Sequence, residues 1–166
     1  MQDEIDALAK SWQGHLAPPV VAALELSKRI TLIGAVFEQA LKAELSELGL
    51  TYAEFDVLAA LMRGGEPYRM KPSELSRALM LTSGGTSNVL QRLAAVGLVE
   101  RSKNAEDARS RFVQLTPSGL ELASAAMRAS VRAHTEAVAG VPEESVRQAA
   151  DALRGVLSVV GRRRFR

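Results

Sequence analysis

The chain of 166 residues contains no cysteine, few aromatic residues and no long hydrophobic run. Without cysteine, disulfide bonds, thiolate nucleophiles and cysteine-based redox sensing are excluded. Aromatic residues make up only 4% of the sequence, whereas alanine and leucine are abundant, and this balance favours helices over a β-sandwich. The acidic start MQDEIDALAK lacks the apolar segment of a signal peptide. Because charges interrupt every apolar run, we expect a cytoplasmic protein with no membrane association.

Side chains that support catalysis or metal binding are also scarce. The only histidines, His15 and His134, lie near opposite ends of the chain. Without cysteine, a zinc site would need several carboxylates in addition. The Gly84-Gly85 pair lacks the spacing of a phosphate-binding loop, and no nucleophile–base pair is visible. We therefore expect no enzymatic activity, no catalytic residue, no metal site and no cofactor.

The charge of the chain is nearly balanced, with a formal net charge of +2 and a sequence pI of about 9.2. A small overall excess is compatible with a strongly basic surface, so the placement of charges matters more than their sum. Hydrophobic residues make up 47% of the chain, enough for one globular core in a chain too short for two large domains.

Apolar spacing and helix-capping signals predict a mainly α fold. Apolar residues in the segment 19–48 recur at intervals of three, four or seven, which is typical of a long helix that buries one side. Thr51 and Glu54 have the spacing of a capping box, which predicts a helix start. The other expected elements are helices at 3–12, 73–80, 83–96, 117–139 and 143–160, and short strands at 68–70, 98–101 and 111–115.

Helix, helix, turn, helix and hairpin follow one another in the order of a winged helix–turn–helix domain. In such domains the second helix of the pair enters the major groove of DNA. Here that helix begins SGGTSNVLQRLAAVG, and its first turns are small and polar, as close approach to base edges requires. Leu90, Leu93 and Val96 are expected to face the core. The candidate DNA contacts of this helix are Ser83, Thr86, Ser87, Asn88, Gln91 and Arg92.

A charged loop joins the two strands of the predicted hairpin. Arg109 is the candidate for insertion into the minor groove, whose negative potential attracts arginine. Asp107 would orient that guanidinium through a charge-assisted hydrogen bond. Arg101, Lys103 and Arg111 would contact phosphates. The alternative for this loop is a solvated surface with no partner.

Four segments carry a resemblance to a known family: LTYAEFDVLAAL, PSELSRALMLTSGGTSNVLQRLAAVGLVER, DAR and VQLTPSG. Together they resemble the MarR family of bacterial winged helix–turn–helix transcriptional regulators. The resemblance implies a mainly α fold with a small β-hairpin wing. It also implies a homodimer that binds a pseudo-palindromic operator in double-stranded DNA and represses a neighbouring gene or its own until a small-molecule effector binds. The alternative is an architectural or protein-binding winged helix without an effector.

Dimerisation is also favoured by apolar stripes on the end helices, which would otherwise leave large exposed patches. The alternative is that these helices fold back on their own core. Residues 1–48 and 117–166 are thus expected to form the dimerisation region and 49–116 the DNA-binding domain, folded as one unit. The dimerisation stripe comprises Leu120, Met127, Val131, Val146, Ala150, Leu153 and Leu157.

A narrower resemblance is to the urate-responsive branch of the family. Trp12 and Asp56 match two ligand positions of that branch, but Val89 stands where the branch has an arginine. The resemblance therefore implies ligand contact by Trp12 and Asp56, and poor release by urate. We expect a less anionic, more apolar effector between the dimerisation helices and the winged domain. The alternatives are dimer packing for Trp12 and a solvated or capping role for Asp56.

Overall fold

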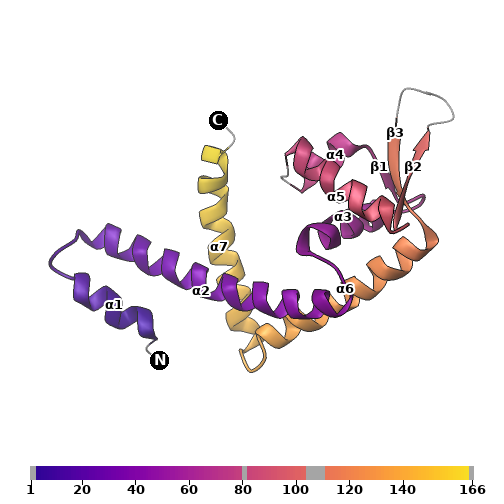
Figure 1. Cartoon of the computed structure of the whole chain (residues 1–166). Coiled ribbons are helices and arrows are strands. Elements are labelled where there is room, and N and C mark those ends of the chain that lie inside the picture. Colours follow the sequence, from indigo (N-terminus) through magenta and orange to yellow (C-terminus); the bar gives the residue numbers. More distant parts are fainter. Residues whose placement is uncertain (1–2, 80–81, 104–110, 165–166) are drawn as a thin grey trace.

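The computed structural model describes residues 3–79, 82–103 and 111–164, which form a mainly helical chain with one small sheet (Figure 1). The predicted mainly α fold with a β-hairpin wing is confirmed, and each predicted element appears within a few residues of its expected bounds. The elements are α1 (Glu4–Trp12), α2 (Pro18–Glu47), α3 (Tyr52–Arg63), β1 (Arg69–Met70), α4 (Pro72–Ala78), α5 (Ser83–Ala95), β2 (Val99–Lys103), β3 (Arg111–Leu115), α6 (Pro117–Ala137) and α7 (Glu143–Arg164).

Side-chain caps fix several helix starts. The Thr51 hydroxyl accepts a hydrogen bond from the Glu54 backbone N–H, and the Glu54 carboxylate accepts one from the Thr51 N–H, so the predicted capping box is present. Thr82 and Thr116 cap α5 and α6 in the same manner, each accepting an N–H bond from the residue three positions later. These bonds satisfy donors that lack a partner within the helix, which sets where each helix begins.

The strands form an antiparallel sheet with the order β1-β3-β2. Arg69 pairs with Gln114 on one side of β3, and Val99 pairs with Leu115 on the other. Side chains alternate between the two faces of a strand. Val113 and Leu115 are therefore buried together on one face, and β3 packs against α3, α4 and α6.

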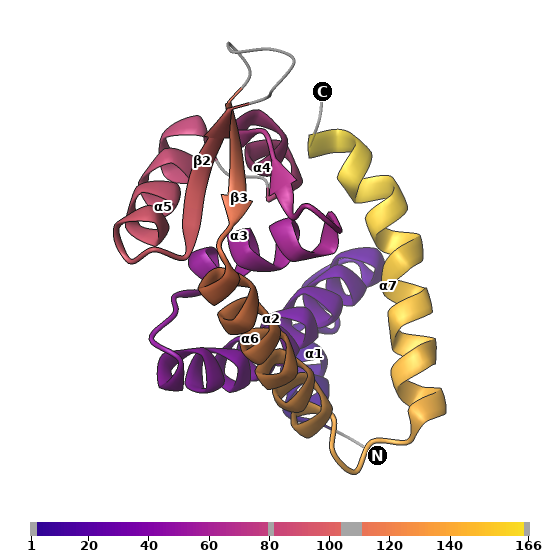
Figure 2. The ribbon, with the colours of Figure 1, turned by 90° about the vertical axis from the view of Figure 1, so that its right-hand side faces the viewer.

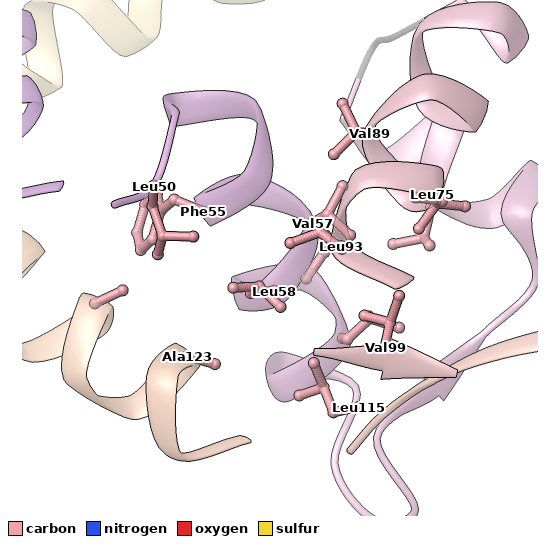
Figure 3. Packing of buried hydrophobic residues seen from close by; sticks show 14 of the residues in the cluster. Leu50, Phe55, Val57, Leu58, Leu75, Val89, Leu93, Val99, Leu115 and Ala123 are labelled. Atoms are coloured by element: carbon pink, nitrogen blue, oxygen red, sulfur yellow. The ribbon is translucent and has the colours of Figure 1, made fainter. Parts of the chain in front are cut away.

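The hydrophobic core lies where α3, α5, α6, the sheet and the second part of α2 meet (Figure 3). Leu58, Leu61 and Leu75 are fully buried there, and Leu45 of α2 is almost so. A buried leucine contributes roughly 1.5–3 kcal/mol by leaving water, so this cluster fixes α3, α4 and α5 relative to one another. It is the scaffold that holds the candidate DNA-binding helix in place.

The remaining helices extend away from this core. α1 packs on the first part of α2. α7 follows the C-terminal end of α6 and runs as a separate helix away from the sheet-bearing core (Figures 1 and 2). The stripe predicted to be buried on the long helix is instead exposed over this part of α2, because none of the described residues covers it: Ile30 is 44% and Ile33 54% exposed. On the last helix Leu157 is 65% exposed. None of the helices in the described ranges is long and apolar enough to cross a membrane.

Candidate nucleic-acid interface

α4 and α5 form the helix–turn–helix pair, with Leu75 and Leu93 buried beneath them. Thr86, predicted to touch DNA, is only 2% exposed. Its hydroxyl donates to the Thr82 carbonyl at 3.0 Å and lies 2.8 Å from the Ser76 hydroxyl of α4. The position of Thr86 on α5 turns it inward, so in this structure it joins the two helices and presents no group to a base edge.

The opposite face of α5 is exposed and polar. Ser87, Asn88 and Gln91 all lie on this face, one helical turn apart or less, and Gly84 precedes them on the same side. Within the described part of the chain these side chains form no hydrogen bond, which leaves their donors and acceptors available for base edges. The face defined by Gly84, Ser87, Asn88 and Gln91 is the candidate reading face.

Arg92, also predicted to contact DNA, has a side chain that is 54% exposed and that forms an ion pair with α3. Its Nε donates to the Glu54 carboxylate of α3 at 3.0 Å. Burial tends to raise the pKa of Glu54, but hydrogen bonds from Thr51 and Arg92 outweigh it, so the pKa of Glu54 lies below its ordinary value. The pair therefore ties the end of α5 to the start of α3.

Of the three residues in and after α5 that were predicted to face the core, two are buried and one is exposed. Leu90 and Leu93 are buried, as expected, whereas Val96 is 69% exposed and the prediction for it is wrong. Val96 follows the last helical residue, so the helical periodicity that placed it inward no longer applies there. Val89, compared above with an arginine of the urate-responsive branch, is only 5% exposed and belongs to the core.

Of the wing, the structure describes the two strands, at residues 99–103 and 111–115. Arg101 is exposed on β2, where it pairs with Val113 of β3. Asp107 and Arg109 lie outside the described residues, as do the side chains of Ser83, Lys103 and Arg111. Their predicted roles therefore stay predictions.

The LTPSG motif, residues 115–119, joins the end of the wing to the segment after α5 through hydrogen bonds. The Thr116 and Ser118 hydroxyls both donate to the Gly97 carbonyl, at 2.7 Å and 3.2 Å. Gly119 lies so close to the Leu98 backbone that a Cβ on it would sit 1.9 Å from the Leu98 oxygen. Only glycine permits this approach. The motif can be recognised in the sequence, but its hydrogen-bond partner Gly97 cannot, because only the folded hairpin between them brings Gly97 and Thr116 together.

A pocket of about 440 Å³ lies between α2, the start of α3 and α6. Among the described residues, its lining contains one acid and no Lys or Arg. Asp56 follows Tyr52 by one turn of α3; burial raises the pKa of Asp56 above its ordinary value, and the Asp56 charge in turn raises the pKa of Tyr52. Ionisable groups with shifted pKa values are common at binding sites, which makes Tyr52 and the neighbouring Asp56 candidates for one. The lining residues are Gly34, Phe37, Glu38, Leu41, Tyr52 and His134.

Trp12 lies in a different pocket, of about 490 Å³, between α1 and the first part of α2. α3, which carries Asp56, lies at the other end of α2 (Figure 1). Within one chain the structure therefore does not bring Trp12 and Asp56 to one site. Arg29 holds α1 in place through ion pairs to Asp3 and Asp6 at 2.8 Å and 2.7 Å.

No metal site is evident in the described ranges, where no three His, Asp or Glu side chains are grouped to hold an ion. His134 accompanies Phe37, with ring centroids 5.5 Å apart, and its Nδ1 lies 2.6 Å from the Ser130 carbonyl oxygen.

Comparisons with known proteins agree with this geometry. Residues 48–110 match the family model described as MarR family. The HTH-type transcriptional regulator PecS of Dickeya dadantii is 27% identical over 141 residues, covering 85% of each chain. The HTH-type transcriptional repressor Rv2887 of Mycobacterium tuberculosis is 36% identical over 101 residues, covering 61% of this chain and 70% of the relative.

The fold is also similar to that of solved structures. A mutant MarR from E. coli complexed with operator DNA superposes with a TM-score of 0.71 at 26% identity, covering 82% of this chain and 96% of that one. AbsC, a MarR family transcriptional regulator from Streptomyces coelicolor, has the same fold with a TM-score of 0.73 at 23% identity. The exposed helix–turn–helix, the wing and these relatives together identify the chain as a member of the MarR family, a DNA-binding transcriptional regulator that acts as a homodimer.

Proposed function

We propose that this regulator is a cytoplasmic, ligand-responsive repressor of its own or a neighbouring gene. The observation that carries the proposal is the exposed polar face of α5, held beside the wing by a continuous core. The relative Rv2887 is itself named a transcriptional repressor. Because the family regulates transcription, we infer that the chain has no catalytic activity of its own.

We propose a division of labour along the chain. Residues 49–116 bind DNA, and residues 1–48 and 117–166 form the dimer. The exposed apolar side chains on α2 and α7 support this division, because Ile33 and Leu157 would lose contact with water against a second copy. Two-fold symmetry of the dimer predicts a pseudo-palindromic operator with half-sites roughly 34–36 Å apart.

We propose that Ser87, Asn88 and Gln91 read base edges in the major groove. Asn and Gln side chains each offer a donor and an acceptor, which matches adenine in a two-bond contact. Gly84 leaves room at the start of α5 for the backbone to approach the duplex. Ser83 would contribute a further hydroxyl at this helix start, where backbone N–H groups attract phosphate.

The wing supplies the second contact. We propose that Arg109 enters the minor groove and that Asp107 orients it, while Arg101, Lys103 and Arg111 contact phosphates. The exposed position of Arg101 at the base of the hairpin supports this assignment. Base contacts would set the sequence preference and the wing cations would supply affinity that depends on salt.

We propose that the effector binds in the pocket between α2, α3 and α6. Glu38 lines this pocket and the Asp56 charge acts on Tyr52 of its lining, so an anion such as urate would meet negative charge there. A neutral or weakly charged molecule with an aromatic or apolar body fits Phe37 and Tyr52 better. A single molecule can touch both Asp56 and Trp12 only across the dimer.

Release of DNA requires a strong preference of the effector for the non-binding conformation. A shift from 1:99 to 99:1 needs about 5.5 kcal/mol of differential binding. The lining of the pocket supports this proposal, because it includes residues of α2 and α6, which we assign to the dimer, and of α3, which we assign to DNA binding.

A mobility-shift titration on the DNA that flanks this protein's own gene tests the proposal. We expect a discrete complex, with a preference over random-sequence DNA on the order of 10³ or more. Asn88→Ala should lower this ratio, whereas Gln148→Ala, an exposed amide on α7, should leave it unchanged. Equal affinity for flanking and random DNA would instead favour the architectural alternative.

A further inference from the structure

Two cations share one aromatic ring at the edge of the sheet. The Arg69 guanidinium carbon lies 4.8 Å from the centroid of the Phe112 ring, and the Lys71 ammonium nitrogen lies 5.7 Å from it. Both distances are within the range of a cation–π interaction. The three residues are called the Phe112 cluster below.

The strand register explains why these three side chains meet. Arg69 pairs with Gln114 and Met70 with Val113, so the next step places Lys71 beside Phe112. Because side chains alternate along a strand, Met70 and Val113 face the core, and the Phe112 cluster lies on the opposite, outer face. The arrangement is therefore built into the pairing of β1 with β3.

The cluster holds positive charge without a matching acid in the part of the chain that the structure describes. None of the ion pairs there includes Arg69 or Lys71. The nearby Glu74 carboxylate accepts a hydrogen bond from the Lys71 backbone N–H, which commits one of its oxygens to capping α4. Two neighbouring cations repel each other, and an anion placed against both would relieve that repulsion.

The position of the cluster relates it to the DNA-binding surface. Lys71 directly precedes α4, the first helix of the helix–turn–helix, and Phe112 is the second residue of the wing strand β3. In Figure 2, β1 and the start of α4 lie beside β3, on the sheet edge opposite β2. The cluster thus lies at the opposite edge of the sheet from Arg101, near the start of β3, which follows the wing loop.

We propose that Arg69 and Lys71 bind a phosphate of the DNA backbone beside the helix–turn–helix contact, and that the Phe112 ring positions both cations for it. The proposal rests on DNA binding by this domain and adds a site that belongs neither to α5 nor to the wing tip. Phosphate contacts carry no base information, so this site contributes affinity equally on every sequence. Phe112 acts through the two cations and touches no phosphate itself.

The salt dependence of binding tests the charge part of the proposal. The full-length protein is titrated with a random-sequence duplex at several potassium chloride concentrations, alongside the Arg69→Ala/Lys71→Ala double variant. Each phosphate contact contributes about 0.9 to the slope of log K against log salt concentration, so loss of one contact per protomer lowers the slope by about 1.8 per dimer. The ratio of affinities for flanking and random DNA should not change.

A matched variant separates a local contact from a general loss of charge. Lys42→Ala/Arg128→Ala removes two exposed cations from α2 and α6, away from the sheet. It should leave the slope nearly unchanged. An equal loss of slope in both double variants, or no loss in Arg69→Ala/Lys71→Ala, would overturn the proposal while leaving sequence-specific binding intact. A natural protein that binds no DNA would refute both proposals.

The ring is tested by two substitutions that leave the charges in place. Phe112→Leu keeps an apolar side chain but removes the aromatic face, and should lower both the affinity and the slope by less than the double charge variant. Phe112→Tyr keeps the face and should behave as the natural protein. Thermal midpoints measured for all variants establish that each is folded. Equal binding by Phe112→Leu and Phe112→Tyr would remove the positioning role of the ring.

Discussion

Replacing Thr86 by valine separates a structural role from a DNA-reading role. Valine keeps the shape of threonine but removes the hydroxyl, which donates to the Thr82 carbonyl and meets the Ser76 hydroxyl. Ser76 retains the Pro72 carbonyl as a partner, and the Thr82 carbonyl retains the Thr86 backbone N–H. No buried polar group is thus left without a partner, and the loss is that of two ordinary hydrogen bonds.

Each such bond contributes about 0.5–1.5 kcal/mol net, so Thr86→Val should lower the free energy of unfolding by roughly 1–3 kcal/mol. For a chain of this size, each kcal/mol moves the thermal midpoint by about 2–4 °C. The assay is thermal and urea unfolding at one fixed protein concentration, because a dimer's stability depends on concentration. Thr86→Ser, which keeps the hydroxyl, serves as the control.

DNA preference should respond differently. The ranking of operator variants by Thr86→Val should match that of the natural protein, since the side chain is 2% exposed and faces α4. Unchanged stability together with an altered ranking would refute the structural role and restore Thr86 to the reading face.

Three further predictions concern Gly119, Asp56 and the wing loop. Gly119→Ala should lower stability by about 1–3 kcal/mol or more in urea unfolding, because its Cβ would sit 1.9 Å from the Leu98 oxygen, whereas Gly155→Ala, which meets open space, should not. Burial raises the pKa of Asp56, so its charge opposes folding above that pKa and the penalty fades as pH falls through it; Asp56→Asn should be the more stable protein at pH 7, and the difference should vanish in acid. Arg109→Ala should cost on the order of 1–3 kcal/mol of DNA binding, and Asp107→Ala should also weaken it; tighter binding by Asp107→Ala would contradict the orienting role.

The element order followed from local signals in the sequence. The capping box of Thr51 and Glu54, the proline-led helix starts and the glycine stops are interactions within a few residues, so they are legible without the fold. The spacing that predicted the burial of Leu90 and Leu93 is local as well. Hence the winged helix–turn–helix could be predicted from sequence.

The roles of individual side chains were harder to predict, because they depend on distant partners. Thr86 and Arg92 are polar residues of the DNA-reading helix α5. Which neighbour their side chains meet depends on how α5 is rotated against α4 and α3. The separation of Trp12 from Asp56 depends on the length of α2, which places α1 and α3 at opposite ends. The Phe112 cluster depends on the register of β1 with β3, which no local pattern specifies.

The central claim is that the exposed face of α5 reads the operator. The most direct measurement is the affinity of the natural protein, Asn88→Ala and Gln91→Ala for a set of operators altered one base pair at a time. Each substitution should flatten the preference at its own base pair, by about 1–3 kcal/mol, and leave the other positions unchanged. If both variants keep the full preference of the natural protein at every position, the account of this face is wrong.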